Sequence, residues 1–112
     1  MTHQPYCYKA KCVYVYDGDS VTLDISLGFN ITMLQQKTRL LGINTPEVRG
    51  PEREKGLVSR NRLRELIDGK DIIVSTYKDK GGKFGRWLVT IFLDGVNVNQ
   101  QLIDEGLAEV YD

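Results

Sequence analysis

The sequence has few of the residues from which metal and redox centres are most often built. It contains one histidine and two cysteines in 112 residues, whereas a structural zinc site usually takes four such ligands. We therefore expect Cys7 and Cys12 to be reduced packing thiols and not a metal or redox pair. His3 lies near the start of the chain, where residues are often frayed, so we assign it no role as a general base.

The chain also lacks an excess of charge and a long apolar run. Fifteen Lys and Arg balance fifteen Asp and Glu, so the field of the whole molecule does not attract a phosphate backbone, and any nucleic-acid site must be local. No stretch approaches the roughly 20 apolar residues that span a membrane, and the first residues do not resemble a signal peptide. These absences predict a protein with no membrane partner and a cytoplasmic location.

The length and the hydrophobic share indicate one packed domain. A chain of 112 residues is short for two domains, and a hydrophobic fraction of 41% is typical of soluble globular proteins. We expect a single domain over residues 1–112, with its core from about residue 10 to residue 111.

Five segments are rich in β-branched and aromatic residues, which predicts five strands. In the second segment Val21, Leu23 and Ile25 alternate with polar residues, which is typical of a half-buried strand. The predicted strands cover residues 11–16, 21–27, 31–41, 72–77 and 86–92.

Two further segments have the start and stop signals of helices. Pro51 suits the first turn of a helix that continues to Ile67, with Gly69 placed to end it. Residues 98–105 form a shorter apolar pattern that Gly106 closes. The resulting order predicts a mainly β protein with two helices (α+β), folded as a five-stranded Greek-key barrel of the OB type. Such barrels bind oligonucleotides and oligosaccharides, although a fold alone does not establish a function.

Polar residues suited to phosphate chemistry gather at the ends of the predicted strands. Asp17-Gly-Asp-Ser20 is first of all a common turn sequence. It is not an EF-hand loop, because the twelfth position counted from Asp17 is Gly28 and not Glu. Arg39 and Arg86 are either ordinary surface ion-pair formers or phosphate ligands. Taken singly, none of these residues identifies a function.

Taken together, the motifs resemble the staphylococcal nuclease (thermonuclease) family. The matching segments, in order over roughly residues 14–111, are Asp17-Gly-Asp-Ser20, Arg39-Leu-Leu-Gly-Ile-Asn-Thr-Pro-Glu47, Lys83-Phe-Gly-Arg86 and Asp94-Gly-Val-Asn-Val-Asn99. Several short motifs in the correct order are more specific than any one of them.

The resemblance implies a calcium site and a set of catalytic groups. Asp19 and Asn44 match side-chain ligands of Ca²⁺, and Thr45 matches a residue that offers its backbone carbonyl. The family usually has Asp where this chain has Asn44, and the missing charge predicts weaker calcium binding. The catalytic residues implied are Glu47 as general base, with Arg39 and Arg86 at the phosphate.

The resemblance also implies the substrate and the products. A water attacks phosphorus in line and the bond to the 5′ oxygen breaks, which leaves a 3′ phosphate on DNA or RNA, with single strands preferred. Lys83 and Phe84 match residues that contact substrate, although Phe84 lacks the hydroxyl of the family's usual tyrosine. We expect Phe84 and Tyr111 to hold unstacked bases.

Alternative interpretations remain open at this point. Some domains of this kind have lost their catalytic groups and serve as nucleic-acid- or protein-binding modules, but Asp19, Arg39, Glu47 and Arg86 are all present here. The chain stops before the third helix typical of the family, which suggests a small interaction subunit, or a homodimer formed through the long second hairpin or an exposed barrel face. An origin in a phage or other mobile element is a further hypothesis.

Overall fold

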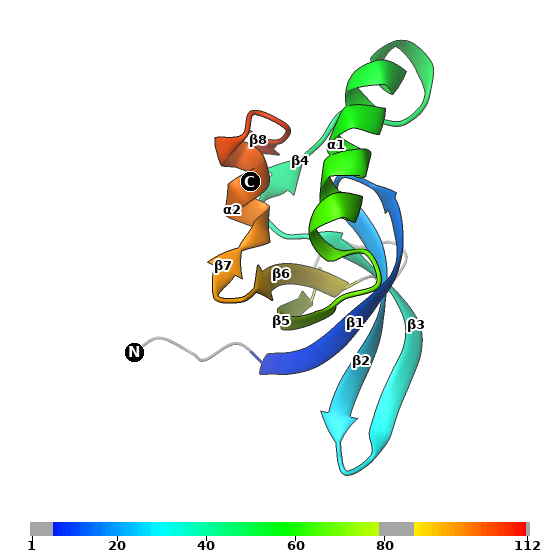
Figure 1. The fold of residues 1–112 in the computed structure, drawn as a ribbon, viewed down its shortest axis with the longest axis vertical. Coiled ribbons are helices and arrows are strands. Elements are labelled where there is room, and N and C mark those ends of the chain that lie inside the picture. The colour runs from blue at the N-terminus through cyan, green and yellow to red at the C-terminus, as the bar shows by residue number, and fades with distance from the viewer. Residues whose placement is uncertain (1–5, 79–86, 112) are drawn as a thin grey trace.

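The computed structural model describes residues 6–78 and 87–111, which form a five-stranded mixed barrel with two α-helices (Figure 1). The barrel strands are β1 (Tyr6–Asp17), β2 (Ser20–Gly28), β3 (Ile31–Leu40), β5 (Asp71–Lys78) and β6 (Trp87–Leu93). They follow the order β3-β2-β1-β5-β6, and a parallel pairing of β3 with β6 closes the barrel. The predicted mainly β barrel is confirmed.

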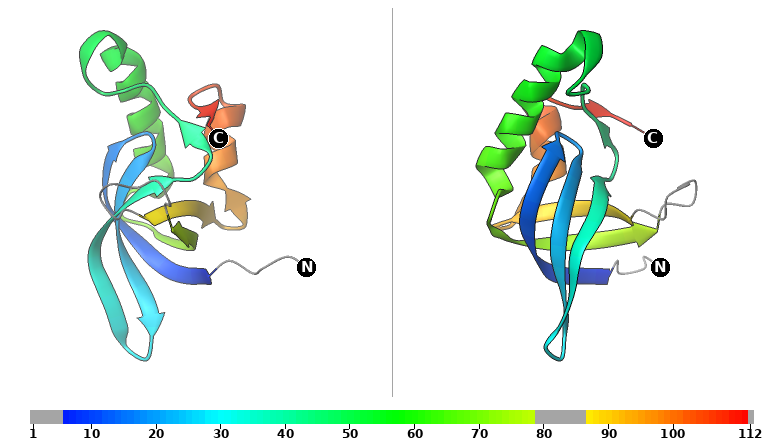
Figure 2. Two further views of the ribbon diagram at one scale, coloured as in Figure 1. Left: turned by 180° about the vertical axis from the view of Figure 1, so that it is seen from behind. Right: turned by 90° about the vertical axis from the view of Figure 1, so that its right-hand side faces the viewer.

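Strand β1 belongs to both halves of the barrel. Its first half pairs with β5, from Tyr6 opposite Thr76 to Lys11 opposite Asp71. Its second half pairs with β2 and ends with Asp17 opposite Ser20. The strand starts earlier than the predicted residue 11 because the partner that orders its first half, β5, lies far along the chain. Strand β1 bends along its length, so the sheet curves toward closure as a barrel (Figure 2).

The two helices lie close to their predicted positions. Pro51 sits in a 3₁₀ turn, η1 (Gly50–Glu52), and the α-helix α1 (Arg53–Ile67) starts after it. The second helix, α2 (Val98–Asp104), is capped at its start by Asn97, whose side chain accepts a hydrogen bond from the backbone N–H of Gln100. No helix within residues 6–78 and 87–111 is long and apolar enough to cross a membrane.

The core lies inside the barrel and beneath both helices. The largest fully buried side chains are those of Leu23, Leu40, Ile43, Leu63, Ile67, Ile91 and Leu102. Cys12 is also fully buried, and burial is the main cause that raises the pKa of its thiol to about 11. Cys12 is therefore an uncharged packing thiol, as predicted.

Three strands of two residues each are absent from the sequence-based prediction. They are β4 (Ile43–Asn44), β7 (Val96–Asn97) and β8 (Glu109–Val110). Strands β4 and β8 pair with each other in a small separate sheet, and the N–H of Tyr111 donates to the carbonyl of Gly42 at 2.8 Å. Two residues carry no readable alternation, so only the tertiary structure reveals that the end of the chain is tied to the loop after β3.

The β2–β3 hairpin extends beyond the barrel (Figure 1). Phe29 and Asn30 form its tip with positive φ angles of 55° and 62°, and the Phe29 side chain is 96% exposed. Further exposed apolar residues on this hairpin are Leu27, Ile31, Met33 and Leu34.

Candidate functional site

A cleft of about 610 Å³ lies between the β1–β2 turn, the end of β3 and the loop after β4. Five residues predicted from the sequence line it: Asp19, Arg39, Asn44, Thr45 and Glu47. They come from three segments that meet where β3 leaves the barrel. The predicted residues Lys83, Phe84 and Arg86 lie outside the described part of the chain.

Asp19 is a buried carboxylate at the base of this cleft. It is 4% exposed, and its Oδ2 accepts a hydrogen bond from the backbone N–H of Thr45 at 3.1 Å. The turn that carries it is closed locally, because Oδ1 of Asp17 accepts from the N–H of Asp19 at 3.1 Å. Asp19 therefore joins the β1–β2 turn to the loop after β4.

A glycine permits this close approach. A Cβ added at Gly18 would lie 2.8 Å from Cγ2 of Thr45 and 2.9 Å from Cβ of Ser59. Gly18 is not among the residues with positive φ. A glycine is therefore needed at this position for space between the turn and its neighbours, whereas the sequence identified the segment only as a common turn.

Gly56 likewise permits close packing, here between α1 and the loop that carries Glu47, the predicted general base. A Cβ at Gly56 in α1 would collide with the backbone carbonyl of Glu47 and lie 2.8 Å from the backbone nitrogen of Val48. Helix α1 thus packs directly against this loop. Glu47 itself is exposed at the rim of the cleft.

Arg39 is held from several sides. Its Nη2 donates to Oδ1 of Asn44 at 3.2 Å, and its Nη1 lies 3.6 Å from Oδ2 of Asp19. The Cζ atom lies 5.5 Å from the centroid of the Tyr111 ring, which is within the range of a cation–π contact. The side chain remains 24% exposed, so the guanidinium is positioned but still reachable from solvent.

Two carboxylates stand close together in the turn at the cleft. Burial, reinforced by the neighbouring Asp19, raises the pKa of Asp17 to about 6, because burial and a nearby carboxylate both disfavour the charged form. The buried Oγ1 of Thr45 has no hydrogen-bond partner among the described residues. Asp17 also lines the cleft, and its place in the same turn as Asp19 is the signal in the sequence that points to it.

The donors present fit calcium better than a transition metal. The described residues hold no group of three or more His, Cys, Asp or Glu side chains arranged for a metal. Asp19, the amide oxygen of Asn44 and the carbonyl of Thr45 are instead oxygen donors of mixed kind, which Ca²⁺ accepts together with water.

Asn99 of the last motif and the predicted substrate-binding residue Tyr111 lie outside the cleft lining. Asn99 is 5% exposed; its Oδ1 accepts from the N–H of Ile91, and its Nδ2 donates to the carbonyls of Leu41 and Val89. It fastens α2 to β6 and to Leu41, which directly follows β3. Tyr111 does not line the cleft but stacks beside Arg39.

Comparison with known proteins identifies relatives that match most of this chain. The chain is 32% identical over 98 residues to the SPbeta prophage-derived endonuclease YokF of Bacillus subtilis, covering 84% of this chain and 31% of that protein. It is 31% identical over 100 residues to the endonuclease YncB of Bacillus subtilis, covering 81% of this chain and 47% of that protein.

A third relative is an uncharacterized endonuclease of Escherichia coli O157:H7. Identity is 30% over 104 residues, which cover 91% of this chain and 60% of that protein. The chain thus spans between 31% and 60% of the length of these three relatives. Residues 37–112, well over half of the chain, match the family described as staphylococcal nuclease homologue, and the chain belongs to that family.

Proposed function

We propose that this chain is a calcium-dependent nuclease that hydrolyses phosphodiester bonds of DNA or RNA, prefers single strands and leaves 3′-phosphate products. The observation that supports this most is the meeting of Asp19, Arg39 and Glu47 around one cleft, with Asn44 and Thr45 beside them. Relatives named endonucleases support the reaction class.

The residues around the cleft suit an in-line displacement at phosphorus. Arg39 has a planar guanidinium that is held in place and partly exposed, so it can donate parallel hydrogen bonds to a phosphate. Glu47 stands on a loop braced by α1, where it can accept a proton from the attacking water. By resemblance, Arg86 stabilises charge on the phosphate, while Lys83 and Phe84 contact the substrate.

Asp19, Asn44 and Thr45 are the residues that would hold the cation. A bound Ca²⁺ supplies positive charge next to the phosphate and makes a bound water more acidic. Asn44 keeps the oxygen donor but carries no charge, so the affinity depends more heavily on Asp19.

Asn44, which stands where the family usually has Asp, also favours a second candidate function. This is a catalytically weak or inactive module that binds nucleic acid or protein. A site with one carboxylate fewer holds calcium less tightly. A protein whose calcium affinity is too low at working concentrations would bind a strand without cutting it.

A cleavage assay separates the two functions. Denatured DNA is incubated with the protein in calcium and, separately, in chelator, beside Glu47→Gln and Arg86→Ala variants. We expect cutting by the wild type in calcium only, with at least a hundredfold loss in either variant, which is about 3 kcal/mol of transition-state stabilisation. Intact DNA in all lanes would favour the binding module.

A homodimer through the long hairpin is also proposed. The exposed Phe29 and Leu34 support it, because apolar groups at a protruding tip gain from being covered. Sedimentation of the wild type beside a Phe29→Asn variant tests it, and a monomeric wild type at all concentrations would exclude it.

A mobile-element origin is proposed on a narrower basis. One relative carries a prophage in its name. Phage genes on both sides of the coding sequence would support this origin, and unrelated chromosomal neighbours would count against it.

A further inference from the structure

The outer face of β1, β2 and β3 continues directly from Arg39. The buried residues Val15, Val21 and Thr38 stand opposite one another across the three strands and point into the barrel. Because side chains alternate along a strand, the residues next to them point outward. The outward side of this sheet is therefore defined by the register.

Two outward rows can be followed across the strands. In one row, Thr22 is paired with Tyr14 on one side and Lys37 on the other. In the neighbouring row, Ser20 is paired with Arg39. Lys37 and Arg39 are two residues apart on the same strand, so their side chains follow each other along one face.

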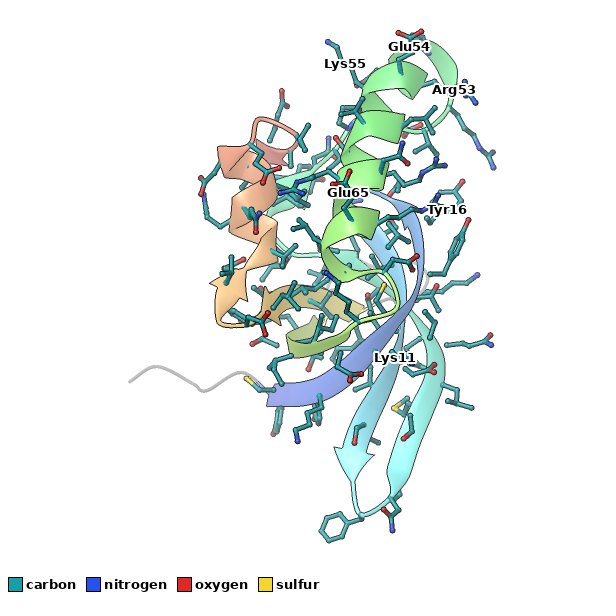
Figure 3. The ribbon with its side chains drawn as sticks, viewed as in Figure 1. Lys11, Tyr16, Arg53, Glu54, Lys55 and Glu65 are labelled. Atoms are coloured by element: carbon teal, nitrogen blue, oxygen red, sulfur yellow. The ribbon has the colours of Figure 1, made fainter. Side chains whose placement is uncertain are left out.

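Two tyrosines are unusually accessible on this face. Tyr14 is 52% exposed and Tyr16 is 44% exposed, and both also line the cleft that holds Asp19 and Arg39. Figure 3 shows Tyr16 standing away from the end of β1 into open space. The Tyr14 ring is backed by Arg64, whose Cζ lies 5.6 Å from its centroid.

The face also carries exposed basic side chains. Lys37 and Arg49 are exposed and line the same cleft. The carboxylates of Asp17, Asp19 and Glu47 also line the cleft, and Asp19 is paired with Arg39. Among the described residues of this face, the cations left over for a nucleic-acid backbone are therefore Lys37 and Arg49.

We propose that this face, made of Tyr14, Tyr16, Thr22, Lys37 and Arg49, binds the stretch of single-stranded nucleic acid next to the scissile phosphate. The inference rests on the proposed function for the position of that phosphate at Arg39. Lys37 and Arg49 contact the backbone, and the tyrosine rings stack on unpaired bases. Bases in a duplex are already stacked, so the face selects single strands.

Binding is measured without cleavage, by fluorescence anisotropy of a labelled twelve-residue oligothymidylate in EDTA. Tyr14→Ser and Tyr16→Ser each weaken binding about fivefold or more, as the loss of one base–aromatic stack predicts, and the Tyr14→Phe variant retains wild-type affinity. Lys37→Gln weakens binding and lowers the slope of log K against log salt by about 0.7. Tyr6→Ser and Lys55→Gln serve as matched controls, because Tyr6 lies at the other end of β1 from Tyr14 and Tyr16. Lys55 lies near the start of α1, as Figure 3 shows.

The outcomes separate this inference from the proposed function. Weaker binding by the serine variants but not by the controls supports it, whether or not the wild type cuts DNA in calcium. Equal affinities for all variants overturn it, as does a wild type that does not bind the oligomer, even if the wild type cuts DNA. The inference is also overturned if unlabelled duplex of the same length displaces the labelled strand as effectively as unlabelled single strand does.

Discussion

At the residue scale, Arg39 owes its position to Tyr111 as well as to the carboxylate and amide beside it. Replacing Tyr111 by Leu removes the cation–π contact, and we expect kcat/KM on denatured DNA to fall about two- to fivefold, the worth of one exposed contact. Tyr111→Phe keeps the ring and should behave as the wild type. Steady-state cleavage rates measure both effects.

An Arg39→Gln background provides the control for this prediction. If Tyr111 acts through Arg39, Tyr111→Leu has no further effect once the guanidinium is gone. An equal fold-decrease of kcat/KM in the wild-type and Arg39→Gln backgrounds would mean that Tyr111 contacts the substrate independently of Arg39, as the sequence alone suggested.

Asn44 is the second residue whose role can be isolated. Asn44→Asp restores a carboxylate beside Asp19, so calcium should bind about tenfold more tightly, because affinity rises with ligand charge. Titration calorimetry of the protein with CaCl₂ measures this without substrate. Asn61→Asp, an exposed change on α1, is the matched control. An unchanged affinity for Asn44→Asp would remove Asn44 from the ligand set.

At the scale of elements, helix α1 acts as a brace for the loop that carries Glu47. Gly56→Ala improves helix propensity by about 1 kcal/mol, yet its Cβ meets the backbone of Glu47 and Val48. Backbone cannot yield as a side chain can, so we expect a net loss of about 1–3 kcal/mol in the free energy of unfolding together with reduced cleavage. Urea unfolding and DNA cleavage report the two effects.

Val58→Ala offers a comparison on the same helix. Val58 is 56% exposed, so its truncation should leave stability nearly unchanged. A Gly56→Ala variant as stable and as active as Val58→Ala would show that the loop moves aside at little cost.

The two helices are joined at the surface by Arg62 of α1 and Glu105 just after α2. Nε of Arg62 lies 2.7 Å from Oε1 of Glu105, and Nη2 lies 3.0 Å from Oε2. The hydrogen bonds from Arg62, joined by one from Gln101, lower the pKa of Glu105 from 4.5 to about 2. A carboxyl whose pKa is lowered by folding contributes stability that is present above pH 4.5 and lost as the pH falls toward 2.

Glu105→Gln should therefore unfold at lower urea than the wild type at pH 6, and the two midpoints should converge as the pH approaches 2. Glu54→Gln, on the first turn of α1, is the control. A midpoint difference that does not change with pH would show that packing, and not the ion pair, accounts for the effect. Added salt should narrow the difference at pH 6, since the pair is exposed.

At the scale of the whole molecule, a chain without net charge must attract a polyanion through a small region. If Lys37, Arg39 and Arg49 make the backbone contacts of the described face, the slope of log K against log salt for a single strand should be about −2. Anisotropy titrations over a salt series measure it. A slope of −4 or steeper would show that a wider basic surface takes part.

The barrel and its strand positions followed from local patterns. Alternation along Val21 to Ile25 and the turn residues between strands act over a few positions, so they could be read directly. The β4–β8 pair and the first half of β1 could not, because each depends on a partner far along the chain.

The sequence by itself determined the fold class, the family and the chemical identity of Asp19, Arg39 and Glu47, because motifs and periodicity are local properties. Only the tertiary structure decided that Gly18 and Gly56 are spacers, that Tyr111 stacks on Arg39, and that two tyrosines share an outer face with it. Distances between segments and the register of paired strands arise only when the barrel closes, and those distances turn separate motifs into a site.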